Sequence, residues 1–125
     1  MVFTYQSIDH VQLAGPKNCE DDARSFYGEL LGLEEITKPQ ALQKNGGVWF
    51  QAGNVHLHIG IDVSFIPARK AHPAIEVHDL NAMKSYLSSK SITYKVDTQI
   101  PDIDRIYVHD PFGNRLEFLE YIGPF

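Results

Sequence analysis

The fold is decided by a short stretch that the chain carries twice. Residues 8–13 read Ile-Asp-His-Val-Gln-Leu, and residues 71–77 read Ala-His-Pro-Ala-Ile-Glu-Val. His10 heads the first copy and His72 heads the second, and each copy is followed by a helix-like segment and several short strand-like segments. Such self-similarity is typical of a fold in which one supersecondary unit is repeated and the copies pack together.

The two copies also end alike. Gly-Asn at residues 53–54 leads into Leu-His-Ile at residues 57–59, and Gly-Asn at residues 113–114 leads into Leu-Glu-Phe at residues 116–118. If the copies pack about a pseudo-twofold axis, four side chains of metal-ligand type occupy two pairs of equivalent positions. These four are His10, His58, His72 and Glu117.

Hydrophobic periodicity and turn residues predict the order strand, helix, strand, strand, strand in each copy. The first copy has predicted strands at 8–13, 34–37, 48–52 and 55–61, and a helix that begins near Asn18 and ends at Gly32. The second has predicted strands at 71–77, 92–96, 105–109 and 116–122, and a helix capped by Asp79. We therefore predict an α+β fold in which two tandem βαβββ modules, at about 6–62 and 70–121, form a curved mixed sheet, a partial barrel around a cavity. Both modules would belong to a single domain covering residues 1–125.

Composition narrows the class of protein. The chain has 125 residues, is 43% hydrophobic and carries a net charge of -5 with scattered Lys and Arg, which gives no basic footprint for nucleic acid or an anionic membrane. Its one cysteine, Cys19, excludes an intramolecular disulfide and favours a reducing compartment. The chain also has no signal-peptide pattern at its start and no apolar run long enough to span a bilayer. We expect a cytoplasmic protein that binds neither nucleic acid nor membrane.

Strand alternation places the polar candidates on one side of the predicted sheet. Successive side chains of a strand face opposite sides, so His56 and His58 point away from the helix-packed core, as does Glu117 on the last strand. If the sheet is curved, these residues line its interior. Three imidazoles and one carboxylate suit one divalent ion such as Zn, Ni, Co, Fe or Mn, with positions left open for water or substrate.

Alternatives remain for each of these residues. His56 shares a face with His58 and could replace it as the ligand, although the alignment of residues 57–59 with 116–118 favours His58. Taken singly, a strand histidine is more often a half-exposed or hydrogen-bonded residue, and a lone Glu is usually solvated. Four further residues could contact a small-molecule substrate, although the two aromatic ones could equally be packing residues: Gln12, Trp49, Arg105 and Tyr107.

Four stretches of the chain resemble the vicinal oxygen chelate superfamily, which includes glyoxalase I, extradiol dioxygenases, fosfomycin resistance enzymes and bleomycin-binding proteins. The stretches are residues 8–11, 26–33, 71–80 and 110–118. The resemblance implies paired βαβββ modules around a metal-centred cavity, often in a homodimer. It also implies metal ligands at His10, His72 and Glu117, with a fourth at His58.

The function that this resemblance implies is that of a metal-dependent, glyoxalase-like lyase or isomerase. The ion would bind a small oxygen-bearing substrate and stabilise an anionic intermediate such as an enediolate. Glu117 would be the fourth ligand and, if it can detach from the ion, the general base for a proton alpha to a carbonyl. The alternatives are a non-enzymatic small-molecule binding protein of the antibiotic-resistance type, and a dioxygenase of the same superfamily.

Overall fold

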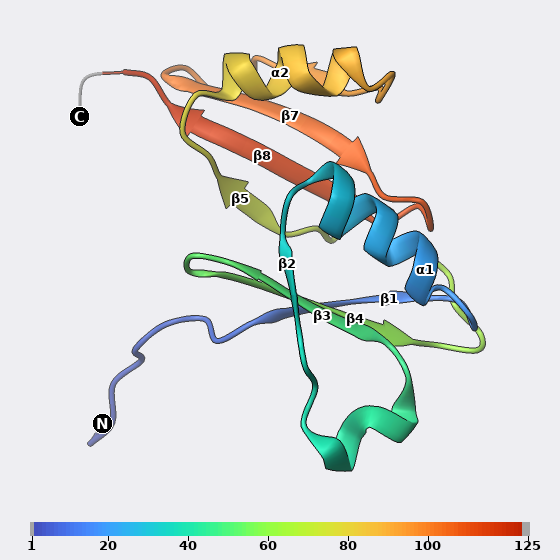
Figure 1. Ribbon diagram of the computed structural model, residues 1–125. Helices are drawn as coiled ribbons and strands as arrows, with labels where there is room; N and C mark the ends of the chain where they lie inside the picture. Colours follow the sequence, from blue (N-terminus) through green and yellow to red (C-terminus); the bar gives the residue numbers. More distant parts are fainter. Residues whose placement is uncertain (1, 124–125) are drawn as a thin grey trace. The chain divides into compact units, whose positions relative to one another are not determined.

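The computed structural model describes residues 2–123, which form two βαβββ units (Figure 1). The compact units are Met1–Phe65 and Ile66–Phe125, and each contains a four-stranded mixed sheet of its own. The predicted α+β fold of two tandem modules is confirmed, as two sheets and not one closed barrel. The junction at residue 65 falls in the connector that the sequence predicts between the modules. The union of both modules in one domain around a cavity stays a prediction.

The first unit begins with a strand and a helix and ends with a strand hairpin. Its elements are β1 (Val11–Gly15), α1 (Glu20–Ala23), a π-helical segment η1 (Arg24–Leu30), β2 (Glu34–Ile36), a 3-10 segment η2 (Gln40–Asn45), β3 (Val48–Ala52) and β4 (Val55–Ile61). The sheet order is β1-β4-β3-β2, with β1 parallel to β4 and the other pairs antiparallel. The first and last strands of the unit are therefore neighbours.

The helical segment of this unit supplies part of its core. Ala23, Phe26 and Tyr27 are buried, and the Tyr27 ring lies 5.7 Å from that of Phe50 on β3. The predicted helix is present, but its second part is π-helical, with wider turns than an α-helix. The helix begins just after the predicted Asn18, which has a left-handed backbone (φ 66°), and Cys19 occupies the cap position without a side-chain capping hydrogen bond.

β1 begins later than the sequence predicts. The prediction included Ile8, but Ile8 is 79% exposed and the parallel ladder starts where Val11 lies opposite Leu57. The strand predicted at 71–77 is likewise reduced to Ala74–Glu76. In both places alternation of apolar and polar residues continues beyond the residues that have a neighbouring strand, so pattern alone overestimates the strand.

The second unit repeats this topology. Its elements are β5 (Ala74–Glu76), α2 (Leu80–Ser89), β6 (Lys95–Asp97), β7 (Ile103–His109) and β8 (Arg115–Tyr121). The sheet order is β5-β8-β7-β6, again with the first and last strands parallel. The α2 helix lies along this sheet (Figure 1) and buries Leu80 and Leu87 completely.

The start of α2 is held by two carboxylates. As predicted, Asp79 caps the helix, since its Oδ1 accepts a hydrogen bond from the Ala82 backbone N–H at 3.0 Å. Glu120 on β8 accepts from the N–H groups of Asp79 (2.8 Å) and Leu80 (3.0 Å). These two backbone N–H groups lower the pKa of the Glu120 carboxyl below its usual value. Glu120 thus fastens the helix to the strand that carries Glu117.

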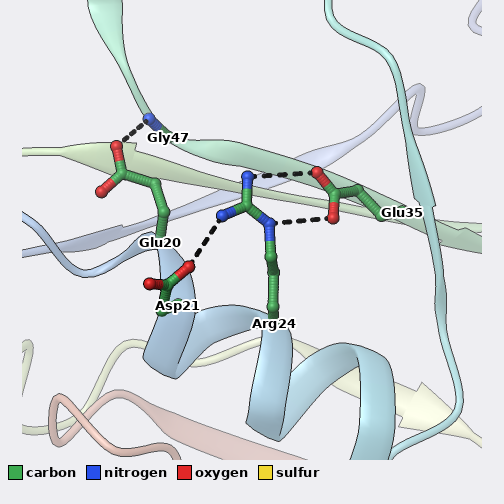
Figure 2. A network of polar contacts seen from close by, with 5 residues as sticks. All are labelled: Glu20, Asp21, Arg24, Glu35 and Gly47. Carbon is green, nitrogen blue, oxygen red and sulfur yellow. Dashed lines mark hydrogen bonds and ion pairs between the residues drawn. The ribbon is translucent and has the colours of Figure 1, made fainter.

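A polar network fastens the helical segment of the first unit to its sheet. Figure 2 shows Arg24 paired with both oxygens of Glu35 on β2, at 3.0 and 3.3 Å, and with Asp21 at 3.0 Å. Glu20 accepts a hydrogen bond from the backbone N–H of Gly47 at 3.1 Å, just before β3. Because the Arg24 side chain is 45% exposed, each of its ion pairs stabilises the folded protein by only about 0.2–1 kcal/mol.

Gly47 is required where β3 approaches β4. Its φ is 87°, in the left-handed region, and a Cβ atom added there would lie 2.3 Å from the carbonyl oxygen of Ile59. Gly32 has a similar φ of 76°, but nothing lies within 4 Å of an added Cβ. A Cβ atom at Gly47 would therefore introduce both backbone strain and steric overlap, whereas a Cβ atom at Gly32 would introduce backbone strain alone.

We predict that Gly47→Ala lowers the free energy of unfolding by about 3 kcal/mol or more, because strain and overlap add. Gly32→Ala, which introduces strain alone, should cost about 1–2 kcal/mol. Urea unfolding followed by circular dichroism measures both. An equal loss for the two variants would contradict the close approach of Gly47 to β4.

We predict that Glu120→Gln destabilises the protein near neutral pH and that the difference from the unsubstituted chain disappears in acid. The folded pKa of Glu120 is below the reference value of 4.5, so its carboxylate stabilises the fold above that pH. This contribution is lost as the pH falls below about 4.5 and through the lower folded pKa. Denaturant unfolding at a series of pH values measures the difference.

The matched control for this pH series is Glu34→Gln, which changes an exposed carboxyl on β2. It should alter stability little at any pH. A difference between Glu120→Gln and the parent chain that stays constant from neutral pH into acid would rule out the charged contact with the start of α2.

Candidate functional site

The parallel ladders place the four predicted metal ligands in equivalent positions. In both units, the residue two positions after the leading histidine lies directly opposite the candidate ligand on the last strand. Gln12 lies opposite His58 on β4, and Ala74 lies opposite Glu117 on β8. The repeat predicted from the sequence is therefore present in the register of both sheets.

In the first unit, His10 and His58 lie against each other. Their rings are stacked, with centroids 4.1 Å apart and an interplanar angle of 15°. The other face of His58 carries the indole of Trp49, at 3.8 Å and 5°. His58 is only 6% exposed, whereas the His10 side chain is 41% exposed. A buried ring held between two others has a fixed orientation, so His58 is positioned by packing.

The protonation chemistry of this pair suits a ligand role. Burial, and after it the neighbouring His10, lowers the pKa of His58, which favours the neutral imidazole that binds metals. His10 places Nδ1 2.8 Å from Asp9 Oδ1, and this contact lowers the pKa of the Asp9 carboxyl. A carboxylate that accepts a hydrogen bond from Nδ1 leaves Nε2 on the opposite side of the ring, available to a metal ion. This arrangement is common in metal-binding histidines.

His56 was the alternative to His58, and the two lie on the same face of β4. His56 lies opposite Gln51 on β3, whereas His58, two residues further along β4, lies opposite Trp49. The ring contact of His10 is with His58. This contact supports His58 as the partner of His10.

In the second unit, His72 and Glu117 are in direct contact. His72 Nε2 lies 2.9 Å from Glu117 Oε1, and the opposite ring nitrogen, Nδ1, lies 2.6 Å from the carbonyl oxygen of Lys70. The backbone N–H of Glu117 donates to the Pro73 carbonyl at 3.0 Å, which holds the segment with His72 beside β8. His72 and Glu117 are thus fixed by backbone contacts on both sides.

The hydrogen-bonding roles of the two ring nitrogens of His72 indicate that the His72–Glu117 pair can bind a cation. A carbonyl oxygen only accepts, so Nδ1 of His72 must carry a proton toward Lys70. In a neutral imidazole, Nε2 then presents a lone pair to an oxygen of Glu117 that also presents lone pairs. A proton or a metal ion between them resolves this conflict. Two ligand atoms that each lie about 2.0–2.2 Å from one ion can be about 3 Å apart, so the pair fits a divalent metal.

Arg105 lies on the other side of Glu117. Its Nη1 is 3.8 Å from Glu117 Oε2 and its Nη2 is 3.2 Å from Asp97 Oδ2. Among the described residues, the buried Nε atom of Arg105 has no hydrogen-bond partner. Glu117 is 6% exposed and the Arg105 side chain 15%. The guanidinium therefore places a positive charge near an otherwise costly buried carboxylate.

Trp49 and Tyr107 occupy equivalent positions as well. Trp49 lies opposite His58 and Tyr107 opposite Glu117 in the antiparallel ladders. Trp49 stacks on His58, and the Tyr107 ring meets that of His72 edge-on at 5.4 Å. The sequence predicts both residues as substrate contacts, but their equivalence was not predicted. Trp49 lies on the strand that precedes the strand of His58, and Tyr107 lies on the strand that precedes the strand of Glu117. This shared position in the two copies is the signal from which the equivalence could be predicted.

Gln12 completes the predicted substrate-binding residues. It is exposed on β1 opposite His58, and its side chain lies over Gly60, where an added Cβ would be 2.6 Å from Gln12 Nε2. Gln12 and Trp49 thus accompany the His10–His58 pair, while Arg105 and Tyr107 accompany the His72–Glu117 pair.

Each unit therefore holds one pair of candidate ligands with an aromatic ring beside it. Within residues 2–123, no three His, Cys, Asp or Glu side chains gather into a group that could hold a metal. That one ion engages both pairs stays a prediction. Over the same residues, no helix is long and apolar enough to cross a membrane.

Comparisons with known proteins bear on this arrangement. The structure of a protein from Bacillus anthracis described as belonging to the glyoxalase family is 50% identical, covers 97% of this chain and 99% of its own, and gives a TM-score of 0.94. A lactoylglutathione lyase from Agrobacterium tumefaciens is 21% identical over 93% of this chain and 94% of its own, with a TM-score of 0.72. A glyoxalase/dioxygenase from Nostoc punctiforme is 18% identical over 93% and 91%, with a TM-score of 0.75. The last two likenesses show the fold alone.

No curated protein matches the chain. The family model described as the Glyoxalase/Bleomycin resistance protein/Dioxygenase superfamily matches residues 7–118, which include all four candidate ligands. Together with the doubled βαβββ topology, this match shows that the chain belongs to the glyoxalase/bleomycin resistance protein/dioxygenase superfamily.

Proposed function

We propose that the chain is a metal-dependent lyase or isomerase of the glyoxalase type, acting on a small oxygen-bearing substrate. One divalent ion, of Zn, Ni, Co, Fe or Mn, would be held by His10, His58, His72 and Glu117. The observation that carries the proposal is the contact between His72 Nε2 and Glu117 Oε1, since Nδ1 of the same ring already faces a carbonyl. The two atoms form a donor pair that a cation completes.

The family likeness supports the class of reaction. When bound, the ion would supply Lewis-acid chemistry, polarising a carbonyl or hydroxyl oxygen of the substrate. The superfamily includes enzymes, and a lactoylglutathione lyase shares the fold. As part of the same proposal, the protein acts in the cytoplasm as a homodimer, in line with the family likeness and with a single cysteine that is buried.

Glu117 is the proposed general base. Its carboxylate is almost fully buried, so few water molecules compete for its oxygens. Arg105, 3.8 Å from Oε2, stays closer to Asp97 than to Glu117 and so offsets charge without forming a tight bidentate pair. On detaching from the ion, the carboxylate would take a proton alpha to a carbonyl.

The aromatic residues keep the imidazoles in place. Trp49 covers one face of His58, and Tyr107 meets the edge of His72. Trp49 also helps to bury His58, which is 6% exposed. Rigid ligand side chains reduce the reorganisation needed when a substrate oxygen arrives.

We predict that the metal-free protein binds about one divalent ion per chain and that a substitution in either pair weakens this binding. His58→Ala and His72→Ala should each lower the affinity by about tenfold or more, because each removes an imidazole ligand. Titration with Ni²⁺, Co²⁺, Zn²⁺ and Mn²⁺, followed by isothermal titration calorimetry and elemental analysis, measures affinity and stoichiometry.

The matched control is His56→Ala, on the same face of β4 and two residues from His58. It should leave the affinity within about twofold, since no ligand is removed. Full metal occupancy in His10→Ala or His72→Ala would contradict the ligand assignment. A parent protein that binds none of the four ions would favour the small-molecule binder of the same superfamily.

We predict that the metal-loaded protein exchanges a proton alpha to a carbonyl with solvent deuterium. Alpha-hydroxyketones and thiol adducts of alpha-ketoaldehydes are the first substrates to test by NMR. Glu117→Gln should slow exchange by about 100-fold or more, the contribution typical of a general base. Asp104→Asn, a change on β7 away from the candidate pairs, is the control. Exchange at the parent rate by Glu117→Gln would exclude Glu117 as the base.

A further inference from the structure

The second unit contains a cavity whose charge is opposite to that of the chain. Its volume is about 540 Å³. The lining comes from the connector before β5, the segment after α2, and strands β6, β7 and β8: Arg69, Ser91, Ile92, Thr93, Tyr94, Lys95, Tyr107, His109 and Arg115. Three of these side chains are cations and none is a carboxylate, although the chain has 16 acidic residues against 11 Lys and Arg.

The two arginines that line this cavity differ from the other two arginines of the chain in their ion pairs. Arg24 and Arg105 each pair with two carboxylates. Arg69 and Arg115 both line the cavity, and in the part of the chain that the structure describes neither has an ion pair. Arginine side chains without an ion pair that line one cavity raise its potential and attract anions.

Arg115 is held in a geometry that suits an oxyanion. Its guanidinium carbon lies 3.9 Å from the centroid of the Tyr107 ring, and Tyr107 is only 8% exposed. Stacking uses the flat face of the guanidinium, so its N–H groups stay available in the plane of the group. These groups form the fork that binds carboxylate or phosphate oxygens in pairs. A stacked arginine is therefore positioned before any ligand arrives.

The cavity lies on the same sheet face as the proposed general base. Lys95 lies opposite Tyr107, Tyr107 opposite Glu117, and His109 opposite Arg115 in the antiparallel ladders. Residues opposite one another in such ladders share a face. Ile106 and Val108, which alternate with Tyr107, are buried on the other face. Tyr107 thus joins the cavity to the His72–Glu117 pair.

We propose that this cavity binds the anionic group of the substrate, a carboxylate or a phosphate, with Arg115 and Lys95 as its main contacts. The inference rests on the proposed function, because it assigns the substrate of that site to the class of anionic oxygen-bearing compounds. The volume exceeds what a lone phosphate fills and matches pockets that hold a whole small molecule. The ligand therefore carries an organic body beside its anionic group, flanked by Ile92, Tyr94 and Tyr107.

The direct test measures anion binding without metal or catalysis. Chelator-treated, isotope-labelled protein is titrated with inorganic phosphate and, separately, with acetate at constant ionic strength, and amide shifts are followed by NMR. We expect saturable shifts centred on Lys95, Tyr107 and Arg115 with at least one anion. The anion that binds more tightly identifies phosphate or carboxylate as the group. Shifts that do not saturate, or that are spread over the surface, overturn the inference.

Matched variants separate a built site from general attraction. Arg115→Gln should weaken binding by about tenfold or more, since a bidentate charged contact is lost. Arg115→Lys keeps the charge but not the fork, and should recover only part of the affinity. Lys44→Gln, an equal change of charge on the first unit, should have no effect. Equal weakening by Arg115→Gln and Lys44→Gln overturns the site.

The metal titration distinguishes the two proposals. Arg115→Gln should bind Ni²⁺ or Zn²⁺ as the parent protein does, because it removes no proposed ligand. Phosphate or acetate binding that persists in a protein without metal affinity would support the cavity and refute the metal site. Metal binding without any saturable anion binding would leave the proposed function standing and overturn this inference. Retained amide dispersion in the spectrum of Arg115→Gln verifies that the variant is folded.

Discussion

Parallel pairing between the first and last strands of each unit is the constraint on which the candidate site depends. In the first unit, this pairing brings the residues around His10 beside β4 and therefore beside His58. In the second, it brings the segment of His72 beside β8 and Glu117. Neither pair is close in sequence, so only the backbone ladder can hold its members together. The chemistry of the pairs therefore follows from sheet topology.

The two pairs have the same origin but different chemistry. His10 and Trp49 both stack on His58, and burial lowers the pKa of His58, which favours the neutral form that binds metals. His72 and Glu117 form a polar contact that a proton or a metal ion completes, with Arg105 beside the carboxylate. In the proposed metal centre, an imidazole-rich pair and a carboxylate-bearing pair would supply the mixed nitrogen and oxygen ligands that borderline divalent ions favour. The equivalent position on the last strand is histidine in one unit and glutamate in the other.

Much of this arrangement could be predicted from the sequence, because it depends on local pattern and on the repeat. The bounds of β3 and β4 agree with the predicted strands, since alternation and the turn at Gly53 mark both ends. Asp79 was found as the cap of α2 for the same reason. The starts of β1 and β5 are predicted three residues too early, because periodicity does not show where pairing with the neighbouring strand begins.

What the sequence could not supply is side-chain contact between elements at positions that the repeat does not mark. The Arg105–Asp97 pair, the stacking of Arg115 on Tyr107 and the hydrogen bonds of Glu120 to the start of α2 all join separate elements. Their side chains are ordinary polar residues in sequence, with no motif to mark them. The cavity of the second unit is lined by residues from several separate elements. In the sequence, its Lys and Arg residues appear only as isolated cations.

The most direct test of the central claim, a metal centre built from both ligand pairs, is X-ray absorption spectroscopy at the metal edge of the loaded protein. The account predicts a shell of nitrogen and oxygen atoms only, with the outer-shell scattering that several imidazoles produce. Sulfur is excluded from that shell because the single cysteine, Cys19, is 2% exposed at the start of α1. A sulfur shell, or a spectrum without imidazole scattering, would contradict the account.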